Sequence, residues 1–194
     1  YNSGGLVATA QLLGDLLGGA VAENLTFTRT LYNADLSEDL DSEEFFDLLG
    51  NSINLSRLVI IATPATASSS EIIINGMDPH VEVTVVGDRT FGKPVGQVGL
   101  QFCGAVLRLT AFQTVNADGF GDYFDGLPAD CTAADDLSVP VGDVADPNMV
   151  AALDYLATGA CPPAPVMQLQ VDEPRELWPA VRRGPPWREF AGAY

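Results

Sequence analysis

Apolar residues recur every three or four positions over residues 6–17 and then meet Gly18 and Gly19, which predicts an amphipathic helix ended by glycine. Residues 25–32 alternate between apolar and polar and are rich in β-branched and aromatic side chains, which predicts a strand. The acidic stretch that follows, from residue 35 to residue 44, predicts a loop that becomes helical near Phe45 and Phe46.

The middle of the chain follows the pattern of an α/β fold. Residues 58–62 form a continuous apolar run, which is typical of a strand buried on both faces. A short helix is expected over residues 71–77 and a second strand over residues 81–86. Strand, helix and strand within about thirty residues predict a βαβ unit with parallel strands.

Two further elements are predicted toward the C-terminus. Residues 105–114 have the composition of a strand. Asp146 followed by Pro147 is typical of an N-cap and the first turn of a helix, which should end near Gly159. From Pro162 onward prolines cluster, so we expect a folded core over residues 1–161 and an extended Pro/Arg-rich tail over residues 162–194.

The charge of the chain excludes one class of partner. It has 26 acidic and 9 basic side chains over 194 residues, a net charge of −17. Nucleic acid is therefore not an expected partner, because phosphates need a basic face. Two stretches without a base, residues 35–47 and 118–146, predict solvated acidic faces. Residues 118–122 do not form an EF-hand, because Phe120 occupies a position where that motif needs a metal ligand. Other kinds of calcium site are not ruled out by the sequence. We expect no bound metal.

The chain has three cysteines, Cys103, Cys131 and Cys161, without the CxxC spacing of a zinc site. An odd number fits one disulfide and one free thiol, and Cys103–Cys131 is the pair that we expect in an oxidising compartment. A fully reduced cytosolic chain is the alternative. No apolar run reaches membrane-spanning length and no signal peptide is visible. The opening residues look like the middle of a loop, so we expect a longer precursor.

Lys93 is the only lysine of the chain and lies 25 residues after Ser68. Ser68 should stand between the first strand of the βαβ unit and its helix, where reacting groups gather in open α/β sheets. Unpaired N–H groups at such a helix start bind anions, so a serine there could combine a nucleophile with part of an oxyanion hole. The alternative is that Ser68, Ser69 and Ser70 only cap the helix.

A lysine can act as a base only when it is neutral, and burial in an apolar site lowers the pKa of its amine. Glu71 and Gln97 could orient that amine; Gln97 is the better partner, because a charged Glu71 beside the amine would raise its pKa. A lysine snorkelling from a turn is the alternative. The only histidine, His80, should lie at the opposite edge of the sheet, so we expect a surface turn residue rather than a Ser-His triad.

Three segments resemble the carboxyl-terminal processing, or tail-specific, serine proteases, which use a Ser–Lys dyad. Residues 67–71, Ala-Ser-Ser-Ser-Glu, resemble the family's small-Ser-Ala-Ser-Glu segment. Residues 86–97 resemble Val-Gly-Glu-x-Thr-Phe-Gly-Lys-Gly-x-x-Gln, with Asp88 for glutamate and Pro94 for glycine. Residues 1–5 resemble the end of the family's Asp-Leu-Arg-x-Asn-x-Gly-Gly motif.

This resemblance implies a role for each matching residue. Ser68 would be the nucleophile and Lys93 the general base, and Glu71 and Gln97 would support the dyad. The oxyanion would be bound by N–H groups of Gly4 or Gly5 together with Ser69. No metal or organic cofactor is implied.

The resemblance also implies an architecture and a setting. The fold would be α/β, of the crotonase-like (ClpP-like) kind. The family usually adds a PDZ domain at a position before this chain starts, so we expect a core fragment that lacks it. The implied partner is a protein or peptide substrate, in a periplasmic or other extracytoplasmic location. Membrane anchoring through an earlier segment and oligomer formation stay open. The rival function is a non-catalytic ligand- or peptide-binding module on the same fold.

Overall fold

A computed structural model describes residues 1–140 and 142–163. Within them the fold is mixed α/β, with one three-stranded and one four-stranded sheet. The predicted tail lies outside the described residues, apart from its first two positions. No helix in the described part is long and apolar enough to cross a membrane. The same residues contain no group of three or more His, Cys, Asp or Glu side chains that could hold a metal ion.

The predicted βαβ unit is confirmed. Strand β3 (Arg57–Ala62) leads to helix α3 (Ser69–Met77) and then to β4 (Glu82–Gly87), which pairs with β3 in parallel. The short strand β7 (Cys131–Thr132) adds in parallel on the other side of β4. The expectation that β3 is buried on both faces holds in part. Leu58 and Ile60 pack toward α1 and α3 and Val59 packs toward α4, but Ile61 is 37% exposed.

The four-stranded sheet contains two strands that the sequence patterns did not predict. Its order is β2-β1-β6-β5, with β1 (Thr26–Leu31) and β6 (Ala105–Val115) close to their expected positions. Strand β5 (Val95–Phe102) directly follows the lysine segment and pairs with β6 as a hairpin.

The second unexpected strand corrects the helix expected near Phe45 and Phe46. A short helix α2 (Ser37–Leu40) is followed by strand β2 (Ser42–Phe45), which pairs antiparallel with β1. The pairing is stabilised by Glu43, which accepts hydrogen bonds from Thr26 Oγ1 and Arg29 Nε.

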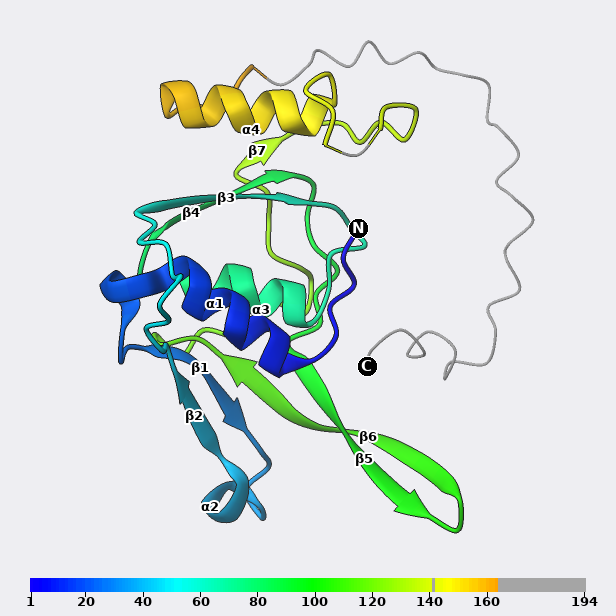
Figure 1. Cartoon of the computed structure of the whole chain (residues 1–194). Coiled ribbons are helices and arrows are strands. Elements are labelled where there is room, and N and C mark those ends of the chain that lie inside the picture. The colour runs from blue at the N-terminus through cyan, green and yellow to red at the C-terminus, as the bar shows by residue number, and fades with distance from the viewer. Residues whose placement is uncertain (141, 164–194) are drawn as a thin grey trace, which may run out of the picture.

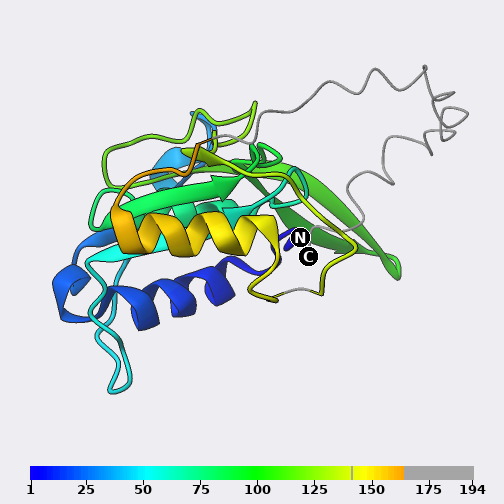
Figure 2. The ribbon, with the colours of Figure 1, turned by 90° about the horizontal axis from the view of Figure 1, so that it is seen from above.

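The elements form layers, as Figures 1 and 2 show. Helix α4 (Pro147–Thr158) covers one face of the three-stranded sheet; α1 (Val7–Ala22) and α3 lie between that sheet and the four-stranded one. Helix α1 passes Gly18, where an end was predicted, and kinks at Gly19 (φ 55°, ψ −146°). Phe27, Phe46 and Met77 are buried where α1, α3 and β1 meet.

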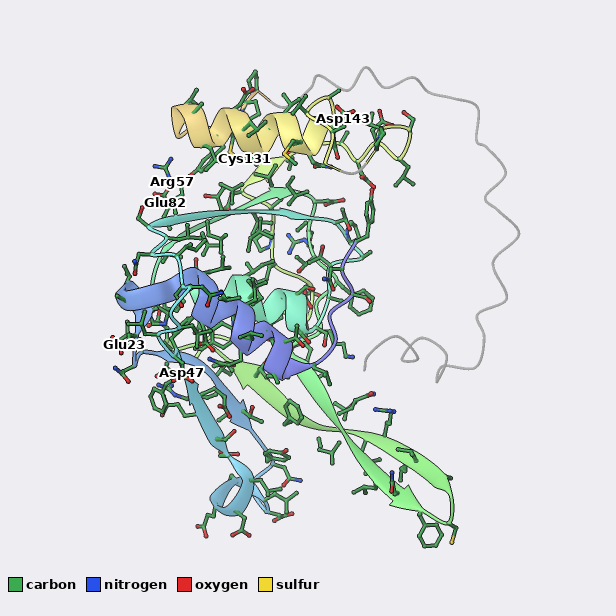
Figure 3. The ribbon with its side chains drawn as sticks, viewed as in Figure 1. Glu23, Asp47, Arg57, Glu82, Cys131 and Asp143 are labelled. Atoms are coloured by element: carbon green, nitrogen blue, oxygen red, sulfur yellow. A yellow bond between two sulfur atoms is a disulfide. The ribbon has the colours of Figure 1, made fainter. Side chains whose placement is uncertain are left out.

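The disulfide joins Cys131 to Cys161, so the expected Cys103–Cys131 pair is wrong. Cys103 lies exposed in the turn between β5 and β6 and carries a free thiol. Helix α4 begins at the predicted cap, where Asp146 accepts from the N–H of Asn148, and runs back over the sheet. That return brings the Cα atom of Cys161 to 5.2 Å from that of Cys131, which is labelled in Figure 3.

Candidate active site

Ser68 occupies the turn between β3 and α3, at the N-cap of the helix. Its φ of 58° and ψ of −123° lie in a region that non-glycine residues rarely adopt. Such strain persists only where the surroundings hold it, and it concentrates at functional sites. The neighbouring backbone supplies that support: Ala67 N donates to Asn2 O, and Phe91 N donates to Thr66 O.

The carboxylate of Glu71 is fully buried and joins the serine segment to the lysine segment. Its Oε2 accepts from the N–H groups of Ser68 at 2.7 Å and Lys93 at 2.9 Å. Its Oε1 accepts from the Thr90 hydroxyl at 2.6 Å and the Gly92 N–H at 2.7 Å. All four partners are donors, as an acceptor-only carboxylate requires. We call these five residues the Glu71 junction.

Ser68 and Lys93 line one pocket with a volume of about 210 Å³. Helix α3, the N-terminal segment and the β5–β6 hairpin enclose it. The other lining residues are Gly5, Leu6, Val7, Ile72, Val95, Gly96, Gln97, Arg108, Phe112 and Thr114. The two chemically important side chains, 25 positions apart in the sequence, therefore share a partly apolar space.

The environment of Lys93 changes the acidity of its amine. The side chain is half-buried, and this burial lowers the pKa of Lys93 from its ordinary value of 10.5. The negative charge of Glu71 acts in the opposite direction and does not cancel the effect of burial. Because the Glu71 carboxylate is engaged with backbone N–H groups and Thr90, it supports Lys93 through the backbone.

Gln97 also lines the pocket, and its Oε1 is buried without a hydrogen-bond partner among the described residues. A buried acceptor without a partner costs free energy, about 1–3 kcal/mol for a neutral group. Such a cost is commonly found where an atom has a functional partner. The amide oxygen of Gln97 is thus available to a donor in the pocket.

The three residues expected to bind an oxyanion lie against one another. A Cβ atom on Gly4, where φ is +85°, would stand 2.5 Å from Ala67 O and 2.7 Å from Ser69 N, so only glycine fits. The Gly4 N–H donates to Asn2 Oδ1 at 2.9 Å, and the Gly5 N–H donates to Ser69 Oγ at 3.0 Å. An oxyanion bound by either group would have to replace that partner. Ser69 is the first residue of α3, where N–H groups have no partner within the helix.

His80 lies in the turn between α3 and β4, as the sequence predicts. It is half-buried rather than on the open surface: its Nε2 lies 2.8 Å from Thr26 O, and its ring packs edge-on against Phe46. It does not line the pocket of Ser68 and Lys93.

Sequence reasoning did not assign roles to Asn2 and Thr90. Thr90 Oγ1 donates to Glu71 and accepts from Leu127 N at 2.7 Å, so it joins the junction to the segment that follows β6. Gly92, at φ +91°, is packed against that segment as well: a Cβ atom there would lie 2.3 Å from Phe124 O. The position of Thr90 inside the lysine motif was the one feature of the sequence that could have indicated a role for it. Nothing in the sequence indicated its hydrogen bonds to Glu71 and Leu127.

Comparisons with known proteins place this chain in the class of serine peptidases. The model of Peptidase family S41 matches residues 1–130. The chain belongs to that family.

Individual relatives support the same family assignment. A protein of Staphylococcus haemolyticus (strain JCSC1435) named "Probable CtpA-like serine protease" is 25% identical over 107 residues, which are 55% of this chain and 22% of that protein. A structure from Bacteroides fragilis NCTC 9343, assigned to the S41 proteases, is 26% identical with a TM-score of 0.74. It covers 82% of this chain and 43% of its own.

The fold is also similar to that of a photosystem II D1 C-terminal processing protease, with a TM-score of 0.56 and 20% identity over 78% of this chain and 36% of that one. This likeness concerns the fold alone. The chain spans less than half the length of each of these relatives.

Proposed function

We propose that residues 1–161 form the catalytic core of a serine endopeptidase with a crotonase-like fold and a Ser–Lys dyad. Ser68 Oγ attacks the carbonyl carbon of a peptide bond while the neutral Lys93 amine takes its proton. The protonated amine then gives the proton to the leaving amine, and an acyl-enzyme forms on Ser68. Water, deprotonated by Lys93, attacks the ester and releases the second product, which restores both groups.

The observation that supports this proposal most directly is the shared pocket of Ser68 and Lys93. The Glu71 junction fixes both backbones to one fully buried carboxylate, so its hydrogen bonds restrict the relative position of the two residues. Burial lowers the pKa of the Lys93 amine, which raises the fraction present as free base. Gln97 Oε1 would orient that amine by accepting from it.

For the oxyanion we propose the N–H of Ser69 together with that of Gly4 or Gly5. The close contact between Gly4 and the start of α3 supports this pairing, because it places the two backbone segments side by side. Backbone donors fixed in this way stabilise the developing charge without reorganising during the reaction.

We also propose an extracytoplasmic location and protein or peptide substrates. The Cys131–Cys161 bridge supports the location, since disulfides persist in oxidising compartments. The family supports the substrate class.

Hydrolysis of an unstructured peptide by the full-length protein tests the mechanism. Ser68→Ala and Lys93→Ala should each lower kcat by at least about a thousandfold, because a nucleophile and its base act as one unit. His80→Ala is the matched control and should keep activity, after correction for any change in folded fraction. A Lys93→Ala variant with the wild-type rate would contradict the dyad.

Trapping of the acyl-enzyme separates catalysis from the rival function, a non-catalytic binding module. Mass spectrometry after acid quenching during turnover of an activated ester should find the acyl group on Ser68. Peptide binding without turnover and without this adduct would favour the binding module.

A further inference from the structure

The N-terminal segment has no regular structure before α1, yet it lies against the start of α3 (Figure 1). Ser69, the first residue of α3, holds it there through its side-chain hydroxyl. The hydroxyl donates to Gly5 O at 2.7 Å and accepts from Gly5 N at 3.0 Å. Both hydrogen bonds go to one residue, as in a hydrogen-bonded pair of antiparallel strands, so the hydroxyl takes the place of a partner strand.

Helix capping does not account for these contacts. A capping hydroxyl accepts from a backbone N–H two or three residues further along its own helix. The N-cap of α3 is Ser68, whereas the Ser69 hydroxyl bonds a residue 64 positions earlier in the chain. The side chain of Ser69 therefore serves the contact between two segments rather than the start of the helix.

The contact is buried and is supported on both sides of Gly4. Ser69 is 6% exposed, and its hydroxyl uses its one donor and one of its two acceptor positions on Gly5. Gly4 itself has no room for a Cβ atom between Ala67 O and Ser69 N. On the other side Asn2 O accepts from Ala67 N at 3.2 Å. The backbone of Gly4 is therefore fixed against the serine segment.

The hydroxyl also affects which N–H group an oxyanion can reach. The N–H of Gly5 is bonded to the buried Ser69 hydroxyl, which is bonded in turn to the carbonyl of the same residue. The N–H of Gly4 is bonded to Asn2 Oδ1, which belongs to an exposed side chain and can be replaced by water when it turns away. A lost partner costs more free energy in a buried place than at the surface. An oxyanion therefore displaces Asn2 from Gly4 more easily than Ser69 from Gly5.

We propose that the Ser69 hydroxyl is a positioning group of the Ser–Lys peptidase proposed for this chain, and the inference rests on that function. By holding Gly5, the hydroxyl keeps the N–H of Gly4 and the N–H of Ser69 itself at a fixed separation. Both groups can then donate to the oxyanion that forms when Ser68 attacks a carbonyl. The effect is largest in the transition state, because donors fixed in advance gain most where charge develops.

Steady-state peptide hydrolysis by the full-length protein tests this role, with rates corrected for the folded fraction. Ser69→Ala removes both hydrogen bonds to Gly5 and should lower kcat by about tenfold to a hundredfold, with KM changed by less than about twofold. Ser69→Thr keeps the hydroxyl and should retain most of the rate, because Ser69 lines a second pocket of about 240 Å³ that can take the added methyl group. Ser70→Ala is the matched control: it removes a hydroxyl from the next residue of α3, one that does not bond Gly5 in the described structure, and should keep the wild-type kcat.

A transition-state analogue separates positioning from a purely structural role. In the adduct of a peptide aldehyde with Ser68, the former carbonyl oxygen occupies the oxyanion position. The aldehyde should therefore bind Ser69→Ala at least about tenfold more weakly than wild type. The matching peptide alcohol forms no adduct and should bind both proteins equally. The apparent pKa in the pH profile of kcat/KM should not change, because Lys93 keeps its surroundings.

A wild-type kcat in Ser69→Ala overturns the inference, and so does a lower kcat with unchanged binding of the aldehyde. A higher kcat also overturns it, since the hydroxyl would then compete with the oxyanion for the N–H of Gly5. Ser68→Ala distinguishes this failure from failure of the proposed function. If Ser68→Ala is inactive while Ser69→Ala has the wild-type rate, only the positioning role fails. If Ser68→Ala hydrolyses peptides as fast as wild type, the proposed nucleophile fails and the positioning role fails with it.

Discussion

The lysine segment of the Glu71 junction is followed directly in the chain by the β5–β6 hairpin, yet the two regions are stabilised in different ways. At the junction a fully buried carboxylate has four donors within 2.9 Å and closes a loop between two segments. Two residues after Lys93 the hairpin begins, and its outer half depends on ladder hydrogen bonds and on side chains that nothing in the described structure covers.

This difference shows what the precise positioning of two side chains requires. A nucleophile and its base must be held within a fraction of an ångström, so their supports are buried and fully satisfied. The outer half of the hairpin has no comparable network of side-chain hydrogen bonds among the described residues, and its apolar side chains are exposed there. Gln97 connects the hairpin to the pocket: its backbone lies in strand β5, and its side chain lines the pocket of Ser68 and Lys93.

Glu71→Ala should have the largest effect, because it removes a fully buried carboxylate and leaves its four donors without their acceptor. We expect the free energy of unfolding to fall by about 3–5 kcal/mol and peptide hydrolysis to be lost. Urea denaturation measures the first and initial rates the second. Glu23→Ala, at an exposed position labelled in Figure 3, is the control. A loss below about 1 kcal/mol would mean that the junction does not hold the site together.

A pair of glycine substitutions compares the two regions directly. Gly4→Ala should cost about 2 kcal/mol and most of the activity, since the new Cβ atom would lie 2.5 Å from Ala67 O at a positive φ. Gly99→Ala in the hairpin meets only Val106 Cγ1, at 3.5 Å, and should change stability by less than about 0.5 kcal/mol. Equal effects in denaturation experiments would remove the distinction between the regions.

The pH dependence of kcat/KM tests the burial of Lys93. Because burial lowers the pKa of its amine, activity should rise with pH and level off at an apparent pKa below 10.5. Stability has the same sign: the folded state binds the proton less readily than the unfolded chain, so the cost of burying the charge disappears as pH rises toward 10.5.

Val95→Thr sharpens this test by adding a hydroxyl to the pocket wall. The pKa of Lys93 should move up, and each half-unit rise should lower the rate at pH 7 by about threefold. Val98→Thr, in the same strand but outside the pocket lining, should leave the profile unchanged. An unaltered profile in Val95→Thr would argue against a lysine base.

Gln97→Met should have a small effect on stability, and the direction of that effect is informative. Removal of a buried acceptor that lacks a partner should raise the free energy of unfolding by about 0.5–1 kcal/mol, while loss of the orienting amide lowers kcat several-fold. Thermal melting and steady-state kinetics on the same samples measure both. Gln101→Met, at an exposed position of the same strand, should change neither. A stabilised variant with full activity would show that the amide does not orient the amine.

Sequence patterns predicted the elements whose signals are local. The βαβ unit followed from one apolar run and its spacing, and α4 from its caps: Asp146 accepts from Asn148 N, and Gly159 adopts the left-handed conformation. Strand β2 was missed because its residues are acidic and its existence depends on pairing with β1. Strand β5 was missed because Gly96 and Gly99 weaken its pattern.

The candidate site likewise has a part that the sequence predicted and a part that it did not. The residue types and their spacing indicated Ser68 and Lys93, and the structure brings both to one pocket. The sequence could not indicate that Glu71 holds backbone N–H groups 21 and 22 residues away, because such contacts depend on how the two segments meet in space. The predicted disulfide was wrong for the same reason. Cys131 pairs with Cys161 because α4 runs back over the sheet and brings Cys161 close to it.

The Cys131–Cys161 bond has a practical consequence for any enzyme that digests itself. It encloses α4 and the connection from β7, much of which is exposed. A backbone nick anywhere within that closed loop leaves both fragments covalently tethered, so the trimmed molecule migrates as an intact chain on a gel until a reductant is added. Purity judged without dithiothreitol would therefore overestimate the uncut fraction.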